Sequence, residues 1–255
     1  TSPFAFTGNK FEFRGVGASQ SIGLVNTVLN AILSIEMLEM AELIEKGNKP
    51  IDVIKKFLTE HKRIIFNGDG YSTEWEEEAS KRGLFNIKNT VDAIQCLKEK
   101  KNIELLTKLG IFTDIEIESR YEISLESYCK KMLVEAATAV KMVNNQIYPA
   151  AVNYLNKIAN TALHLKQIEV DDECVINHAK ALSKLIYDMK CTLTTLQGNI
   201  DIAKSFKEFD SKANYINEFI VLGMKDLRKI VDVIETKVDS KDWPIPTYVD
   251  LLFSL

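Results

Sequence analysis

The stretch that decides the fold is residues 113–145, "TDIEIESRYEISLESYCKKMLVEAATAVKMVNN". Thr113 and Glu116 have the spacing of a capping box, in which the two residues satisfy each other's backbone N–H groups at a helix start. The Leu, Ile, Met and Val residues that follow recur at helical spacing and form an apolar stripe. We therefore expect one long amphipathic helix from Thr113 to about Asn145, with its stripe in a hydrophobic core.

The same pattern continues to the end of the chain. Three further long helices are expected: one that begins after a break at Tyr148-Pro149 and runs to about Gln167, one capped by Asp171 or Asp172 that runs to about Phe206, and one capped by Ser211 that runs to about Val238. Long amphipathic helices with short connections are typical of an antiparallel bundle. The sequence has no fixed-period repeat of the kind that would indicate a solenoid.

Most elements expected in the first part of the chain are shorter. We expect strands at 4–6 and 10–15, and then helices from about Ser21 to Glu45, from Pro50, from a capping box at Thr73 and Glu76, from Asn89 or Thr90, and over 103–109. The predicted class is mainly α, with a short β stub at the N-terminus, then a helical layer, then a long-helix antiparallel bundle. The predicted domains are 1–112 and 113–255.

Composition excludes several classes of protein. Hydrophobic residues make up 46% and charged residues 27% of the 255 residues, as in an ordinary globular protein. The net charge is −4 and no basic block indicates a nucleic-acid partner. Charged residues interrupt the apolar runs, so we expect no membrane span. The chain begins "TSPFAF" without a methionine, and we interpret it as a piece of a longer polypeptide.

The thiols and imidazoles are scattered. The four cysteines, Cys96, Cys129, Cys174 and Cys191, include no C-x-x-C pair. This favours reduced thiols in a cytoplasmic protein over a disulfide framework or a zinc site. The three histidines, His61, His164 and His178, lack the companion ligands that a metal site on a helix requires.

The predicted opening strand, within "GNKFEFRGVG" at residues 8–17, places charge on one face. Strand side chains alternate, so Lys10, Glu12 and Arg14 point one way while Phe11 and Phe13 point the other. Two interpretations stay open at this point. The row protects an edge strand with charge, or it lines a polar cavity while the phenylalanines pack a core.

Two further segments have a distinct composition. "NGDGYSTEW", residues 67–75, contains the strongest turn signal in the chain, and we favour an exposed turn before a capped helix over a nucleotide contact. "WPIPTYVDLLF", residues 243–253, is apolar and holds two prolines. We expect this tail to pack against the rest of the chain or against a neighbouring subunit.

The chain resembles glutamine synthetase, and the type III branch in particular. The general resemblance lies in "TSPFAFTGNKFEFR", "SQSIGLVNTVLNAIL" and "NTVDAIQCLKEKKNIELLTKLGIFTDIEIESRYEISLESY". The first is similar to final strands of the family's catalytic barrel, which end in Glu-x-Arg. Three stretches resemble the type III branch alone: "NGDGYSTEW", "QIYPAA" and "WPIPTYVDLLF".

The resemblance implies ATP-dependent ligation of ammonia to glutamate through γ-glutamyl phosphate. It implies that residues 1–112 are the C-terminal part of the catalytic domain. It also implies that Glu12 ligates an active-site Mg²⁺ or Mn²⁺, that Arg14 contacts the transferred phosphoryl group and glutamate, and that Lys10 lies near the ATP phosphates. Hard cations prefer oxygen ligands, and arginine suits bidentate phosphate contacts. The polar face of the opening strand would then point into an active site.

The resemblance further implies a ring-type homo-oligomer, with contacts from the bundle and the tail. The other metal ligands would lie before Thr1, so we expect this piece to be inactive by itself. A second hypothesis is a helical scaffold or interaction module that has lost the chemistry. A third is a stable fragment left by proteolysis or chosen for expression.

Overall fold

The computed structural model describes residues 4–6, 8, 10–13, 21–170, 172–246 and 248–253. Most of these residues are helical, which confirms the predicted mainly helical class. The chain forms two compact units, Thr1–Tyr121 and Glu122–Leu255. Among the described residues, no helix is long and apolar enough to cross a membrane.

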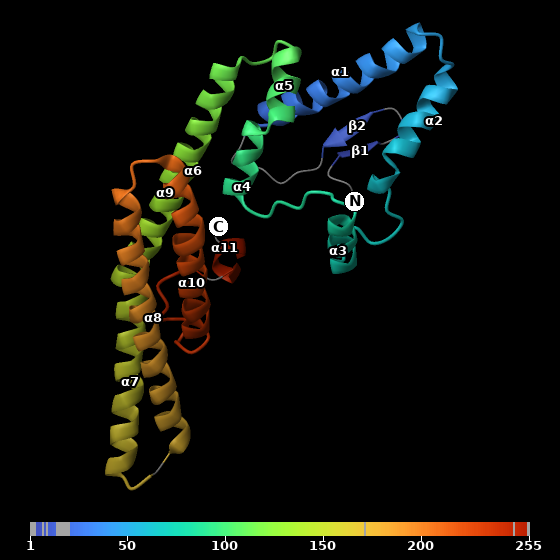
Figure 1. Cartoon of the computed structure of the whole chain (residues 1–255). Helices are drawn as coiled ribbons and strands as arrows, with labels where there is room; N and C mark the ends of the chain where they lie inside the picture. Colours follow the sequence, from blue (N-terminus) through green and yellow to red (C-terminus); the bar gives the residue numbers. More distant parts are fainter. Residues whose placement is uncertain are drawn as a thin grey trace. The chain divides into compact units, whose positions relative to one another are not determined.

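The first unit begins with a short hairpin followed by helices (Figure 1). Its elements are β1 Phe4–Phe6, β2 Phe11–Phe13, α1 Gly23–Glu45, α2 Pro50–Glu60, the 3₁₀ turn Lys62–Ile64, α3 Thr73–Lys81, α4 Thr90–Gln95, the 3₁₀ turn Cys96–Lys98, α5 Lys100–Lys108 and the start of α6. Of the strand predicted over 10–15, the structure shows β2 at Phe11–Phe13. Lys10 precedes the strand, and residues 14 and 15 lie outside the described residues.

Local signals explain several helix ends in this unit. Gly47 has φ +93° and follows α1, a conformation that glycine adopts without steric cost. The side chain of Asn89 accepts from the backbone N–H of Asp92 and caps α4, as one of the two predicted caps. The predicted cap of α3 at Thr73 is wrong. The cap is Ser72, whose Oγ accepts from the backbone N–H of Trp75.

A small core joins the helices of the first unit. Ala31 of α1, Leu106 of α5 and Ile117 of α6 are buried against one another. Half-buried apolar residues of α5 and the turn after it pack around them: Ile103, Leu105, Leu109, Ile111 and Phe112.

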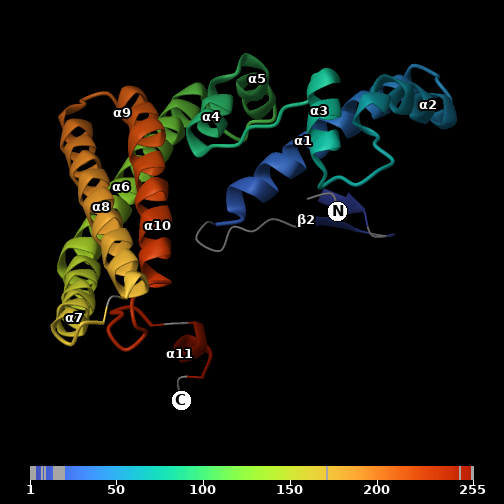
Figure 2. The ribbon, with the colours of Figure 1, turned by 90° about the horizontal axis from the view of Figure 1, so that it is seen from below.

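The second unit is built from long helices. Its elements are the rest of α6 (Asp114–Met142), a π-helical turn Val143–Ile147, α7 Tyr148–Gln167, α8 Glu173–Ser205, α9 Phe209–Tyr215, a π-helical turn Ile216–Ile220, α10 Val221–Glu235 and α11 Tyr248–Phe253. Figures 1 and 2 show α7 and α10 beside α8, and both helices contact it.

Capping follows the prediction at two of the three predicted starts. Thr113 donates its backbone N–H to Glu116 Oε2 at 2.8 Å, and Glu116 donates its own to Thr113 Oγ1 at 3.3 Å. Asp172 accepts from the backbone of Cys174 at 2.9 Å and caps α8. The start predicted at Ser211 is wrong, because α9 begins at Phe209, after Glu208 in an extended conformation.

The predicted helix break at Tyr148-Pro149 is also wrong. The chain stays helical from α6 through the π-helical turn into α7. In that turn the backbone N–H of Tyr148 donates to the carbonyl of Val143, five residues earlier. Pro149 lacks an N–H and its ring clashes in a regular helix interior, and the wider π turn accommodates it at the start of α7.

The core of the second unit centres on α8. Its buried residues follow a spacing of four and three: Leu182, Ile186, Met189, Leu193, Leu196, Ile200 and Ala203. This spacing keeps one face of the helix toward α7 and α10. Ile216, Ile220 and Ile234, which are fully buried, come from the segment that runs back along α8.

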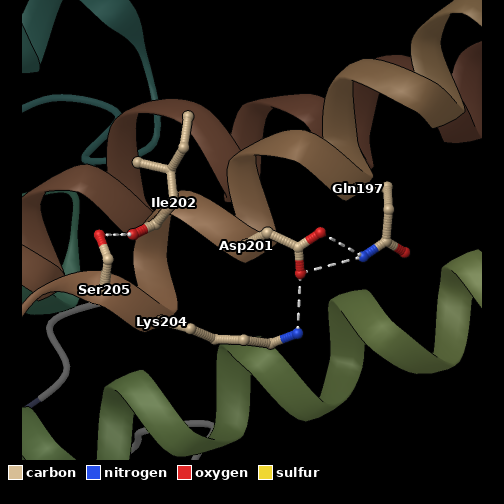
Figure 3. A network of polar contacts seen from close by, with 5 residues as sticks. All are labelled: Gln197, Asp201, Ile202, Lys204 and Ser205. Carbon is tan, nitrogen blue, oxygen red and sulfur yellow. Dashed lines mark hydrogen bonds and ion pairs between the residues drawn. The ribbon is translucent and has the colours of Figure 1, made fainter.

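The last turns of α8 end in a local polar network (Figure 3). Asp201 accepts from Lys204 Nζ at 2.9 Å and from Gln197 Nε2 at 3.4 Å. Ser205 donates its hydroxyl to the carbonyl of Ile202 at 2.7 Å. The Lys204 ammonium, with help from Gln197, lowers the pKa of the Asp201 carboxyl.

Candidate functional site

The hairpin at the N-terminus holds two of the three predicted site residues. β1 and β2 pair antiparallel, with Ala5 opposite Glu12. The chain turns between them through Gly8, which is exposed and has φ +98°. Glycine adopts this conformation without the steric cost that a Cβ would add.

Lys10 and Glu12 lie on the same face, as strand alternation predicts. Lys10 Nζ is 3.4 Å from Glu12 Oε1. The lysine side chain is 66% exposed and the glutamate side chain 34% exposed, so the carboxylate is the more enclosed partner. Arg14 lies outside the described residues, and so do the side chains of Phe11 and Phe13.

The metal chemistry expected at Glu12 needs more ligands than these. A carboxylate suits Mg²⁺ or Mn²⁺, which take six or so oxygen ligands. Among the residues that the structure describes, no group of three or more His, Cys, Asp or Glu side chains has the arrangement of a metal site. Glu12 therefore fits such an ion in donor type, but the described residues do not form a complete metal site around it.

The turn at residues 67–75 has a structural explanation. Phe66 stacks on Trp75 with ring centroids 4.3 Å apart. A Cβ at Gly68 would lie 2.7 Å from the Phe66 ring, which explains the glycine at this position. Ser72 caps the helix that follows, and the Tyr71 side chain is exposed. The observed contacts agree with the predicted exposed turn before a capped helix.

Arg82 holds this turn against the end of α3. Its Nε donates to Glu78 Oε1 at 2.7 Å, and one terminal nitrogen donates to the carbonyl of Ile65 at 2.8 Å. The guanidinium lies over Trp75, 5.7 Å from the ring centroid. Hydrogen bonding from Arg82 lowers the pKa of the Glu78 carboxyl. These groups stabilise the local fold and already satisfy one another.

The thiols and imidazoles have no catalytic arrangement among the described residues. The four cysteines are free. Burial raises the pKa of Cys129, which keeps it a thiol rather than a nucleophilic thiolate. His178 makes a 3.1 Å hydrogen bond to the carbonyl of Lys237 and packs edge-on against Tyr154. His178 thus supports the packing of α8.

The second unit contains a cavity that we did not predict from the sequence. It has a volume of about 700 Å³, and its walls come from the α6–α7 junction, α10 and the tail. Its lining is mostly apolar and includes Ala139, Leu227, Val231, Trp243 and Leu251. The apolar composition of the tail was the one sequence signal, and it could not show that a space remained beneath it.

The tail packs, in part, on its own unit. Trp243 is buried, and Ile245 and Pro246 line the cavity. Leu252 and Phe253 in α11 are 75% and 77% exposed. The first half of the tail therefore packs against the rest of the chain, which is the first of the two predicted alternatives. The second alternative, a contact with a neighbouring subunit, stays a prediction.

The chain is similar to known proteins of one family. Residues 49–166 match the model of the glutamine synthetase C-terminal domain. Over 99% of its length the chain is 34% identical to a type-3 glutamine synthetase of Dictyostelium discoideum. It is also 36% identical to a glutamine synthetase of Butyrivibrio fibrisolvens and 30% identical to one of Bacteroides fragilis, each over its full length. The chain spans 36–37% of the length of these relatives.

Proposed function

Because the chain belongs to the glutamine synthetase family, we propose that it is the C-terminal portion of an enzyme that joins ammonia to glutamate with ATP. One observation carries the proposal, namely the similarity of almost the whole chain to the type-3 enzyme. The reaction would transfer the γ-phosphoryl group of ATP to the side-chain carboxylate of glutamate. Ammonia would then displace phosphate from the γ-glutamyl phosphate.

The opening strand supports this proposal by its chemistry. A divalent cation bound there would neutralise charge on the transferred phosphoryl group. Glu12 would supply one of its oxygen ligands from the half-enclosed face of β2. Lys10, whose Nζ is 3.4 Å from Glu12 Oε1, would place a second positive charge near the phosphates of ATP. Arg14, the remaining residue of the predicted site, would bind the phosphoryl oxygens and glutamate through its guanidinium.

The rest of the chain would serve assembly. We propose that the second unit and α11 contact neighbouring subunits in a ring-type homo-oligomer in the cytoplasm. The exposed Leu252 and Phe253 support this part of the proposal, because exposed neighbouring apolar residues often belong to interfaces. No nucleic-acid or membrane partner is proposed.

A non-catalytic helical module is the second candidate. The observation in its favour is that the second unit has its own core around α8 and contains none of Lys10, Glu12 and Arg14. In that case the hairpin residues would have no role beyond the fold.

The test is Glu12→Gln in a full-length parent enzyme that contains this chain. Gln keeps the size of the side chain and removes the charge that a divalent cation requires. We expect the rate of glutamine formation to fall by at least about 100-fold, as when a group that stabilises the transition state electrostatically is removed. The size of the oligomer should stay unchanged. Glu39→Gln, an exposed glutamate on α1, is the matched control and should keep full activity. Unchanged activity in Glu12→Gln would favour the helical module.

The chain by itself should form no glutamine, because Glu12 would be a single metal ligand and the described residues contain no group of three or more possible ligands. An assay of the 255-residue chain with ATP, glutamate, ammonia and Mg²⁺ or Mn²⁺ tests this. Sustained glutamine production would contradict the proposed dependence on upstream ligands.

A further inference from the structure

We propose that the cavity beneath the tail is a binding site for an uncharged, largely apolar small molecule that carries one hydrogen-bond acceptor. The proposal is independent of the catalytic one, because every residue that lines the cavity lies in the second unit and none is in the hairpin.

Size and lining are those of a small-molecule site. Pockets for such ligands range over about 300–1,000 Å³ and are mainly apolar with a few polar groups. This cavity measures about 700 Å³. Met224, Leu227 and Val231 of α10 form one wall, and Ala139 of α6 and Leu251 of α11 contribute from other sides. Transfer of an apolar molecule from water into this apolar cavity is favourable.

Trp243 is the reason that we expect a hydrogen-bond acceptor on the bound molecule. The residue lines the cavity and is 8% exposed. Its indole Nε1 is buried, and no described residue accepts a hydrogen bond from it. Buried donors normally have acceptors, and a missing one is unfavourable. An ether or carbonyl oxygen on a bound molecule would satisfy this N–H.

The charges at the cavity indicate that the molecule is uncharged. Arg228 donates to Asp232 at 3.1 Å, so its positive charge is already paired. Glu235 also lines the cavity and leaves the lining with one more negative than positive group. An anion would meet this excess negative charge, and a strongly hydrated cation would lose its water against apolar walls.

Prodan, an uncharged fluorescent naphthyl ketone, is a suitable probe. Trp75→Phe leaves Trp243 as the single tryptophan, because the chain has two. We expect saturable binding of one Prodan per chain, a blue shift of its emission, and energy transfer from Trp243. Anilinonaphthalene sulfonate, which is similar in size but anionic, should bind at least about 10-fold more weakly because of the negative lining.

Variants locate the site. Ala139→Phe fills the cavity and should abolish Prodan binding. Ala137→Phe is the matched control, since Ala137 is exposed on the same helix and does not line the cavity. If Ala139→Phe does not fold, as judged by circular dichroism, Val231→Phe fills the same space from α10.

Trp243→Phe tests the hydrogen bond. Loss of one neutral hydrogen bond predicts about 5-fold weaker binding of Prodan. Phenylnaphthylamine lacks the ketone, so its affinity should change by less than about 2-fold. A general loss of packing would instead weaken the binding of both probes to the same extent.

Three results would overturn the proposal. The first is Prodan binding that survives in Ala139→Phe and Val231→Phe. The second is equal weakening of both probes in Trp243→Phe. The third is a Prodan stoichiometry that falls as the protein self-associates, which would assign the cavity to a second copy of the chain. None of these results bears on the Glu12→Gln assay.

Discussion

Lys157 of α7 donates from its Nζ to both carboxylate oxygens of Asp242, the residue before the tail, at 2.6 and 2.7 Å. The two residues are 85 positions apart in the sequence. Asp242 directly precedes the buried Trp243, so this ion pair fixes the point at which the tail leaves the bundle. Hydrogen bonding to Asp242 raises the pKa of Lys157.

Replacement of Lys157 should loosen the tail. Lys157→Met keeps the length of the side chain and removes the charge that binds Asp242. In a Trp75→Phe background we expect the emission of Trp243 to shift to longer wavelength and its quenching by acrylamide to increase. Lys166→Met, at an exposed lysine on the same helix, is the control and should leave both signals unchanged.

The same ion pair predicts an alkaline transition. A group with a raised pKa in the folded state contributes stability that is fully present below its ordinary pKa, here 10.5, and is lost as the pH rises through the raised value. The Trp243 emission should therefore be constant near neutral pH and shift above pH 10.5. Lys157→Met should lack this transition, and a transition of equal size in the variant would assign it to another group.

The connection between α7 and α8 contains a strained residue. Glu169 has φ +61°, a left-handed conformation that disfavours residues with a Cβ. Glu169→Gly should raise the free energy of unfolding by about 0.5–1 kcal/mol, measured by urea denaturation. Glu135→Gly, in the exposed middle of α6, should lower it by about 1 kcal/mol because glycine is a poor helix former. A loss of stability in both variants would contradict the assignment.

Ser72, and not its neighbour Thr73, caps α3. Ser72→Ala should destabilise α3 by about 1 kcal/mol, whereas Thr73→Ala should change it by less than about 0.5 kcal/mol. Hydrogen exchange at the backbone N–H of Trp75 reports on this helix start, because that N–H donates to Ser72 Oγ. Faster exchange in Thr73→Ala than in Ser72→Ala would favour the cap predicted from the sequence.

Local signals made much of the secondary structure predictable. Apolar periodicity predicts the helical class. Local spacing predicts Thr113 as a helix cap and narrows two other caps to the pairs Asn89 or Thr90 and Asp171 or Asp172, because capping depends on residues two or three positions apart. The same-face arrangement of Lys10 and Glu12 followed from strand alternation.

The incorrect predictions depend on choices between similar residues or on tertiary packing. Ser72 and Thr73 are both good caps, and Asp69 decides between them: its carbonyl accepts from the Ser72 hydroxyl at 2.8 Å. Pro149 predicts a break by local rules, but the π turn before it keeps the helix in one piece. Residues from three separate parts of the chain enclose the cavity, which no local pattern reveals.

Asp201 offers a test of the polar network at the end of α8 (Figure 3). Lys204 and Gln197 lower the pKa of its carboxyl below the ordinary value of 3.8. A lowered pKa means that the network stabilises the fold above the ordinary value and that this contribution is lost as the pH falls through the lowered one. NMR titration should return the pKa toward 3.8 in Lys204→Ala. An unchanged pKa would show that the ion pair does not persist in solution.

The central position of α8 predicts a large difference between two leucine substitutions. Leu196 is fully buried on the face that packs against α7 and α10, so Leu196→Ala should lower the free energy of unfolding by about 2–5 kcal/mol through lost burial and a new cavity. Leu163 on α7 is 59% exposed, and Leu163→Ala should cost less than about 0.5 kcal/mol. Urea denaturation followed by circular dichroism measures both. Similar costs for the two variants would mean that the second unit does not have its core on this face of α8.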